Sequence, residues 1–283
     1  MAVGFSPLEC LCVGLAMMFS STILTVKLLP TNELHHERIG AACIGVLILE
    51  DLLAIAVLAF VRCLQQPQTA VGEFAVLSGK LVVFIGVLAL LEKYVLYKVM
   101  ERVERLHELI FTLGLAWCFG CAIISDQMGL FYETGAFFAG VVVARHPISR
   151  FISESLKPIR DFFLVLFFFA LGAKLNLGAV MPVLIPAIVL VGLFTIMKPR
   201  VLSWGFRLMG EAPHFAREAG VRLGQLSEFS LLIALLALET GSLSAPAAQL
   251  IQVTTIFTFI VSSYYVIHTY PTPIATSARL TRT

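Results

Sequence analysis

Residues 39–61 read IGAACIGVLILEDLLAIAVLAFV, an apolar stretch that carries two adjacent carboxylates, Glu50 and Asp51, near its middle. A helix of this length covers about 30 Å, the thickness of the hydrocarbon core of a bilayer, so both acids are expected about half-way across a membrane. An ionised carboxylate there costs on the order of 2.5–3.5 kcal/mol on insertion scales, and such acids commonly mark ion or proton pathways. The stretch therefore predicts an ion site at Glu50 and Asp51.

The composition of the whole chain also indicates a membrane setting. Of 283 residues, 59% are hydrophobic and only 13% are charged, and the mean hydropathy is +0.93. Soluble domains carry about 25% charged residues. The net charge of +2 is too small to indicate a nucleic-acid or acidic partner. We therefore expect an all-α integral membrane protein whose surface faces a lipid bilayer.

No known enzyme or cofactor pattern stands out. Cys118 and Cys121 are the only two of the six cysteines with a redox or zinc spacing, and they lie in an apolar helix without a nearby histidine. Packing of small side chains is the better interpretation. Neither a nucleotide cradle nor a Ser/His/Asp set is visible, so we expect no enzyme activity, no cofactor and no metal beyond a transported ion.

The apolar stretches predict about nine membrane-spanning segments separated by short loops. Their expected ranges are 5–29, 39–61, 74–97, 109–125, 130–144, 162–177, 180 to beyond 198, 221–240 and 247–267. Residues 1–270 would form one transmembrane domain, and residues 271–283 a disordered cytoplasmic tail.

The basic residues predict the orientation of these segments, because lysine and arginine gather in cytoplasmic loops. Loops after even-numbered segments hold Arg62 and Lys174. Loops after odd-numbered segments hold Lys27, Arg38, Lys93, Lys98, Arg102, Arg105, Arg145, Arg150, Lys157, Arg160, Arg200, Arg207, Arg217, Arg222, Arg279 and Arg282. The bias predicts a cytoplasmic C-terminus in a multi-pass protein, and a prokaryotic inner membrane is the expected location.

Two of the predicted segments carry polar residues that indicate interrupted helices. The first contains Ser20, Ser21 and Thr22, and the eighth contains Gly-Gln-Leu-Ser-Glu at 224–228. Hydroxyl and amide groups can satisfy the backbone where a membrane helix unwinds beside a cavity. Paired broken helices mark the binding site of many secondary transporters. Glu228 would offset the positive ends of the half-helices, which we favour over direct ion binding.

Five motifs in this order resemble the monovalent cation:proton antiporter-2 family of Kef-type and related sodium/proton exchangers. They are Phe-Ser-Ser-Thr at 19–22, the run from Gly45 to Asp51, Glu-x-Gly-Ala-Phe-x-Ala-Gly at 133–140, Pro-Ile-Arg-Asp-Phe-Phe at 158–163 followed by Leu-Phe-Phe at 166–168, and Gly-Gln-x-Ser-Glu-Phe at 224–229. The resemblance covers nearly the whole chain.

This resemblance implies a fold of two inverted repeats, with an ion site between two crossing broken helices and a separate panel that forms a homodimer. The chain would match the fourth to twelfth family helices, so that the first three family helices would be lacking. The family usually has Gln or Asp before the key aspartate, whereas this chain has Glu50. The retained acid slightly favours sodium over potassium and leaves both ions open.

The expected mechanism centres on Asp51. Burial disfavours the charged form of a carboxylate, and a second acid beside it adds to that effect, so the pair can hold a proton near neutral pH. Asp51 would bind cation or proton in turn, and Glu50 would support cation ligation or carry the proton. Thr22 or nearby carbonyl groups would offer neutral oxygens. Gln225 and Ser21 would support the site from the interrupted segments.

Lys198 stands where the resemblance implies an intramembrane lysine, and it would pair with Asp51 or Glu50 when no ion is bound. The alternative is a lysine that extends to the membrane interface. The favoured function is exchange of Na+ or K+ for protons by alternating access. The alternative is a non-transporting membrane fragment or an assembly or regulatory subunit.

Overall fold

The computed structural model describes residues 4–29, 38–63, 70–103, 107–144, 149–173 and 180–272. Within these ranges all regular elements are helices and no strand occurs, which confirms the predicted all-α class. The chain divides into two compact units, one formed by residues 1–66 and 176–283 and the other by residues 67–175. Of the predicted tail, residues 273–283 lie outside the described part of the chain.

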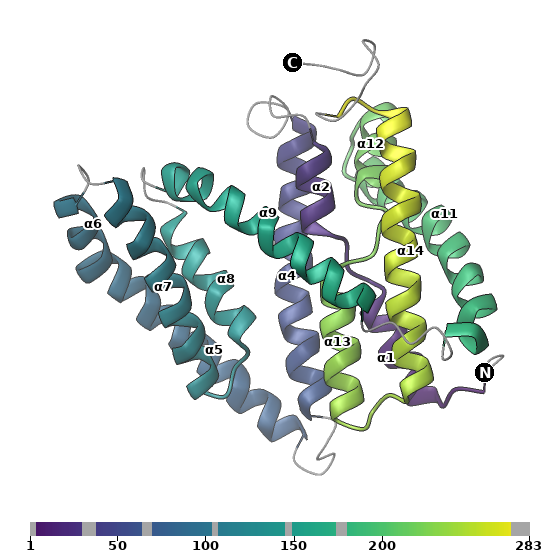
Figure 1. Cartoon of the computed structure of the whole chain (residues 1–283), viewed down its shortest axis with the longest axis horizontal. Coiled ribbons are helices and arrows are strands. Elements are labelled where there is room, and N and C mark those ends of the chain that lie inside the picture. The colour runs from purple at the N-terminus through teal and green to yellow at the C-terminus, as the bar shows by residue number, and fades with distance from the viewer. Residues whose placement is uncertain are drawn as a thin grey trace. The chain divides into compact units, whose positions relative to one another are not determined.

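The first unit contains both interrupted helices. Its elements are α1 (Pro7–Ala16), α2 (Thr22–Leu28), α4 (Arg38–Cys63), the short 3₁₀ helix η2 (Met181–Val183), α11 (Leu184–Leu208), α12 (Pro213–Arg222), α13 (Glu228–Glu239) and α14 (Ala245–Thr269). The chain is non-helical between α1 and α2 and again between α12 and α13 (Figure 1). The two interruptions predicted from sequence are therefore confirmed.

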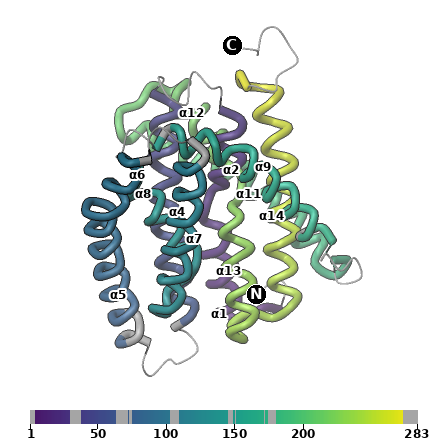
Figure 2. The backbone as a smooth tube through the Cα atoms, turned by 60° about the vertical axis from the view of Figure 1, so that its left-hand side comes forward, coloured from purple at the N-terminus to yellow at the C-terminus, as the bar shows by residue number. Residues whose placement is uncertain are grey.

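The helices of the first unit pack around the interrupted ones. Helix α13 contacts α14, α1 and α4, and α11 contacts α12 and α14. The neighbouring courses of α4 and α13 can be followed in Figures 1 and 2. This arrangement places α4, which carries Glu50 and Asp51, beside the second interrupted helix.

Serine caps define where the interrupted helices resume. Ser21 precedes α2, and its Oγ accepts a hydrogen bond from the Leu24 amide at 3.2 Å. Ser227 precedes α13, and its Oγ accepts from the Phe229 amide at 3.1 Å. A serine in this position satisfies one of the free amides at a helix start. The polar residues that predicted unwinding thus also restart each helix.

Close approach of α11 and α12 depends on two glycines. A Cβ atom on Gly220 would lie 2.3 Å from Ser203 Oγ and 2.5 Å from the Pro199 carbonyl oxygen. A Cβ atom on Gly224 would lie 2.6 Å from Pro199 Cγ. All three distances are too short for a real side chain, so glycine lets the two backbones meet beside the second interruption.

The second unit consists of consecutive helices from one continuous stretch of chain. They are α5 (Ala70–Leu91), the π-helix η1 (Glu92–Leu96), α6 (Tyr97–Val103), α7 (His107–Gln127), α8 (Tyr132–Val143) and α9 (Ser149–Ala173). Gly135 lets α8 approach α7, because a Cβ there would lie 2.5 Å from the Cys121 carbonyl oxygen. At Gly140 a Cβ would meet nothing within 4 Å in the described part of the chain, so close packing on α8 is limited to the Gly135 end.

Five helices in the described ranges are long and apolar enough to cross a membrane, and the chain is an integral multi-pass membrane protein. They are Arg38–Arg62, Ala75–Arg102, Leu109–Gln127, Met181–Leu208 and Ala245–Thr269. Pro7–Ala16 and Tyr132–Val143 are shorter apolar helices. The count of nine segments remains a prediction. Helix α9 begins at Ser149 rather than near residue 162 and contains Pro158, so it departs from the expected boundary.

Candidate functional site at two helix breaks

The two non-helical stretches, here called the first break (residues 17–21) and the second break (residues 223–227), face each other inside the first unit. Ser20 Oγ donates a hydrogen bond to the Leu223 carbonyl oxygen at 2.8 Å. Thr25 Oγ1 donates to the Arg222 carbonyl oxygen at 3.1 Å and accepts from Gln225 Nε2 at 2.7 Å. Side chains of each broken helix thus satisfy groups that the other one leaves free.

Lys198 of α11 joins the two breaks. Its Nζ donates to the Phe19 carbonyl oxygen at 2.6 Å and to the Gln225 carbonyl oxygen at 3.0 Å. These oxygens follow the C-terminal ends of α1 and α12, where helix dipoles concentrate partial negative charge. The hydrogen bonds of Lys198 thus go to carbonyl oxygens, while Glu50 interacts with it electrostatically, and direct pairing with Asp51 or Glu50 stays a prediction. The expectation of an intramembrane lysine agrees with its place between the breaks.

Glu228 provides the opposite charge at the other pair of helix ends. It is the first residue of α13, and its Oε1 accepts from the Ile23 amide of α2 at 3.4 Å. Its carboxylate thus lies beside the positive N-terminal ends of α2 and α13, as expected for the structural role. Its Oε2 is buried and makes no hydrogen bond to any described residue.

The side chain of Asp51, a residue of α4, lies beside Thr22, the first residue of α2. Asp51 is only 9% exposed, and both of its carboxylate oxygens lie 3.4 Å from Thr22 Oγ1. Asp51 also interacts electrostatically with Glu228 and Glu50. The structure thus brings together the carboxylate and the neutral oxygen that sequence reasoning assigned to one cation.

Glu50 contacts the first break instead of sharing the groups around Asp51. Its Oε2 accepts from the Ser20 amide at 2.5 Å, and its Oε1 accepts from Ser20 Oγ at 3.2 Å. Consecutive residues of a helix point in different directions, about 100° apart. The separation agrees with the expectation that Asp51 and Glu50 have different tasks.

Ser21 and Gln225 form a buried polar link between the breaks. Gln225 Nε2 donates to the Ser21 carbonyl oxygen at 3.4 Å, and Ser262 Oγ of α14 donates to Gln225 Oε1 at 3.1 Å. Sequence reasoning missed Ser262 and Thr258, whose Oγ1 accepts from the Leu226 amide at 3.4 Å. Their spacing of four residues, shared with Thr254, places all three on one face of α14 and could have revealed them.

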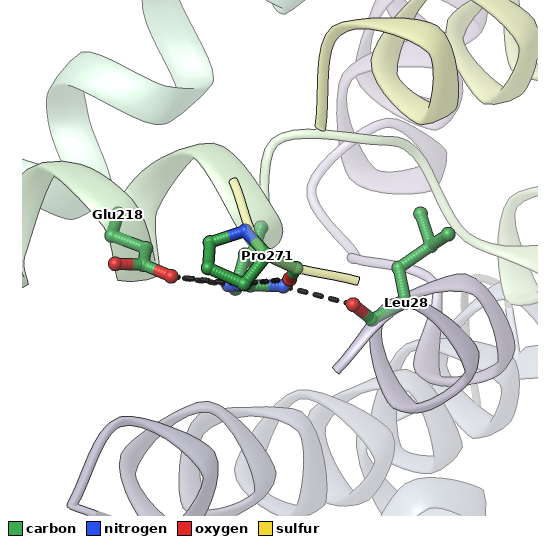
Figure 3. A network of polar contacts seen from close by, with 4 residues as sticks. Leu28, Glu218 and Pro271 are labelled. Atoms are coloured by element: carbon green, nitrogen blue, oxygen red, sulfur yellow. Dashed lines mark hydrogen bonds and ion pairs between the residues drawn. The ribbon is translucent and has the colours of Figure 1, made fainter. Parts of the chain in front are cut away.

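Arg222 does not lie in a loop, as the orientation argument assumed. It was expected in a loop before the eighth segment, but it ends α12 and is 2% exposed. Its guanidinium donates to Glu218 Oε1, to the Leu28 carbonyl oxygen and to the Pro271 carbonyl oxygen (Figure 3). It therefore ties together the end of α2, α12 and the residues after α14. A guanidinium can serve several acceptors at once, which explains why the position is buried.

The arrangement has the charge pattern of a cation site. Glu50, Asp51 and Glu228 bring three carboxylates to the two breaks, and the ammonium group of Lys198 is already engaged by two carbonyl oxygens. Carboxylate and hydroxyl oxygens are suitable ligands for hard cations. The carboxylate of Asp51 can also accept a proton. The geometry can therefore hold a cation or a proton at one buried group.

Comparison with known proteins identifies the family of this chain. The transmembrane sodium/hydrogen exchanger family model matches residues 1–268, and the chain belongs to this family. This confirms the resemblance to cation:proton antiporters noted from the motifs.

Two relatives illustrate the likeness within this family. The chain is 27% identical to the iron transporter MagA of Paramagnetospirillum magneticum over 261 residues, which cover 89% of this chain and 58% of the relative. It is 26% identical to the glutathione-regulated potassium-efflux system protein KefC of Salmonella typhi over 225 residues, which cover 78% of this chain and 36% of the relative. The chain thus spans less than two thirds of the length of either protein.

Proposed function

We propose that this chain exchanges a monovalent cation, Na+ or K+, for protons by alternating access, with Asp51 as the group that the two ions share. The observation that carries the proposal is the buried Asp51 carboxylate beside Thr22 Oγ1, at the point where two broken helices meet. Membership of the exchanger family supports the same function.

The exchange follows from competition for one carboxylate. A cation at Asp51 needs the charged form of the side chain, and a proton removes that charge. Thr22 Oγ1 adds a neutral oxygen for the cation, while Glu50 and Glu228 add negative charge nearby. Because cation and proton cannot occupy Asp51 together, movement of the loaded site from one side of the membrane to the other yields exchange.

The supporting residues keep the broken helices in register around Asp51. Lys198 and Glu228 neutralise the partial charges of the helix ends, and Gln225 and Ser21 hold the two breaks together. Preformed charges of this kind allow backbone to be non-helical within a membrane. The bias of basic residues supports a cytoplasmic C-terminus, and a prokaryotic inner membrane is the proposed location.

The test is collapse of a pH gradient in everted membrane vesicles after addition of sodium or potassium. We expect one or both cations to collapse the gradient in vesicles with the unaltered chain, and Asp51→Asn to reduce this to the level of empty vesicles. Asp126→Asn is the matched control, because Asp126 is an exposed acid at the end of α7 and should leave the response intact.

Three outcomes separate the possibilities. Collapse that is lost only in Asp51→Asn supports exchange at this residue and identifies the cation. Collapse that survives in Asp51→Asn overturns Asp51 as the shared group. No collapse with a well-inserted chain contradicts exchange by this chain and favours the alternative of a non-transporting membrane subunit.

A further inference from the structure

A cavity of about 650 Å³ lies in the first unit between α11, α12 and α14, apart from the carboxylates of the candidate site. Three arginines line it, Arg200 and Arg207 of α11 and Arg217 of α12. Trp204 and Tyr265 line it as well. The three helices that enclose it pack against one another, as the right-hand part of Figure 1 shows. The cavity is thus a basic, partly aromatic pocket on a packed group of helices.

No acid in the described ranges neutralises the three arginines through an ion pair. No carboxylate in these ranges lines the cavity. The printed hydrogen bond of Arg200 goes to the Ile196 carbonyl oxygen of its own helix at 3.4 Å. Guanidinium groups that converge on one cavity without an acid form a site for an anion, and their planar donors match phosphate particularly well.

The position of the pocket along α11 fits the boundary between hydrocarbon and headgroups. Arg207 follows Lys198 by nine residues on the same helix, which is about 14 Å at 1.5 Å per residue. Half the hydrocarbon thickness of a bilayer is about 15 Å. If Lys198 lies near the midplane, as the helix breaks indicate, Arg207 lies at headgroup depth. Trp204 and Tyr265 are exposed aromatic residues of the kind found at this depth.

One face of α11 also changes from apolar to basic along its length. The residues on this face recur every three or four positions, and they are Val189, Leu193, Ile196, Arg200, Trp204 and Arg207. The three apolar members are exposed. Such a face can hold an acyl chain along its apolar half and a phosphate at its basic end. A soluble phosphate would use only the basic end and would leave the apolar half without a partner.

We propose that this pocket binds the phosphate headgroup of an anionic phospholipid. Arg207 and Arg217 contact the phosphate, and Arg200 adds positive charge on the side toward the membrane interior. Basic pockets between transmembrane helices are a known way to recognise anionic lipid. None of the carboxylates around Asp51 lines the pocket, although Gly224 of the second break and Ser262 do. Lipid binding is measured without transport, so either proposal can fail alone.

The test is native mass spectrometry of the purified chain titrated with phosphatidylglycerol or phosphatidylcholine. We expect preferential retention of phosphatidylglycerol, and roughly tenfold weaker retention in the double variant Arg207→Gln/Arg217→Gln, because two charge-assisted contacts are lost. Lys27→Gln/Arg38→Gln is the matched control, since it removes two exposed positive charges of the same unit outside the pocket. The conservative variant Arg207→Lys/Arg217→Lys keeps the charge and should keep most of the preference.

The outcomes decide the proposal directly. Equal phosphatidylglycerol retention by the unaltered chain and the pocket variant would overturn it, as would an equal loss in the control variant. Displacement of the lipid by millimolar inorganic phosphate would assign the arginines to a soluble anion and overturn the lipid assignment. A pocket variant that no longer elutes as a monodisperse species is replaced by Arg207→Gln alone, for which a loss of at least severalfold supports the site and no loss overturns it.

Discussion

The two helix breaks have a similar backbone course, but different chemistry satisfies them. In the first break, the charged side chain of Glu50 accepts from the Ser20 amide, and Glu228 accepts from the Ile23 amide just beyond. In the second break, the Leu226 amide donates to the neutral hydroxyl of Thr258, and a pair of serines caps α13. The first break therefore shares its partners with the candidate ion site.

This difference indicates a division of tasks. A change in the charge of the acids around Asp51 alters the groups that hold the first break, whereas the hydroxyls at the second break do not titrate in the physiological range. We expect the first break to respond to cation and proton binding and the second to act as a fixed support. Variants that affect one break, or both, can test this comparison.

The largest loss of stability is expected from Lys198→Met, because Lys198 donates hydrogen bonds to both breaks. The substitution keeps a long side chain but leaves the Phe19 and Gln225 carbonyl oxygens without their donor. Each buried polar group without a partner costs on the order of 1–3 kcal/mol. We expect a fall of several degrees in the thermal unfolding midpoint of the purified protein in detergent.

Lys157→Met is the control for this experiment, because Lys157 is an exposed lysine of α9. Its unfolding midpoint should stay close to that of the unaltered chain. Equal midpoints for Lys198→Met and the control would show that the lysine is not a shared support of the two breaks.

An intermediate loss of stability is expected from Glu50→Gln, which weakens the hydrogen bonds at the first break. The amide oxygen can still accept from Ser20, but the charge-assisted part of the hydrogen bond is lost, on the order of 1 kcal/mol. Because Glu50 also lies beside Asp51, we expect a change in the cation concentration that gives half-maximal collapse of a pH gradient. Glu211→Gln, which removes only a surface ion pair with Arg38, should leave that concentration unchanged.

The smallest loss of stability is expected from Thr258→Val, which removes a hydrogen-bond acceptor from the second break. The Leu226 amide loses its acceptor, but the bond is long at 3.4 Å, so the cost is expected to be about 1 kcal/mol. The cation dependence of exchange should not change. A shift in that dependence as large as that of Glu50→Gln would contradict the division between the breaks.

Thr254→Val is a close control for Thr258→Val. Thr254 lies four residues earlier on the same face of α14, and its buried hydroxyl has no partner in the described part of the chain. Replacing that hydroxyl with a methyl group removes a polar atom that gains nothing from burial. We expect the unfolding midpoint to stay constant or to rise slightly.

Local sequence features predicted the parts of the site that depend on one helix at a time. The serines of both breaks and the two acids of α4 could be placed from the positions of polar residues in apolar stretches. The contact between Asp51 of α4 and Thr22 of α2 joins two helices and was also anticipated, and Glu228 lies beside two helix N-termini, where its predicted structural role would place it. The start of α9 was missed, since the predicted segment began with the apolar run at Phe162, whereas the helix already begins at Ser149 and includes the charged residues before that run.

The sequence by itself determined that this chain is an all-helical membrane protein with two interrupted helices and a pair of acids within one long apolar helix. Only the tertiary structure decided that Lys198 donates its hydrogen bonds to two carbonyl oxygens, and that Arg222 is buried at the end of α12 instead of lying in a loop. The reason is physical: hydropathy and helix breaks are properties of neighbouring residues, whereas the partner of a buried charge depends on which helix ends meet in space. For Lys198 and Phe19, those ends are 179 residues apart in the chain.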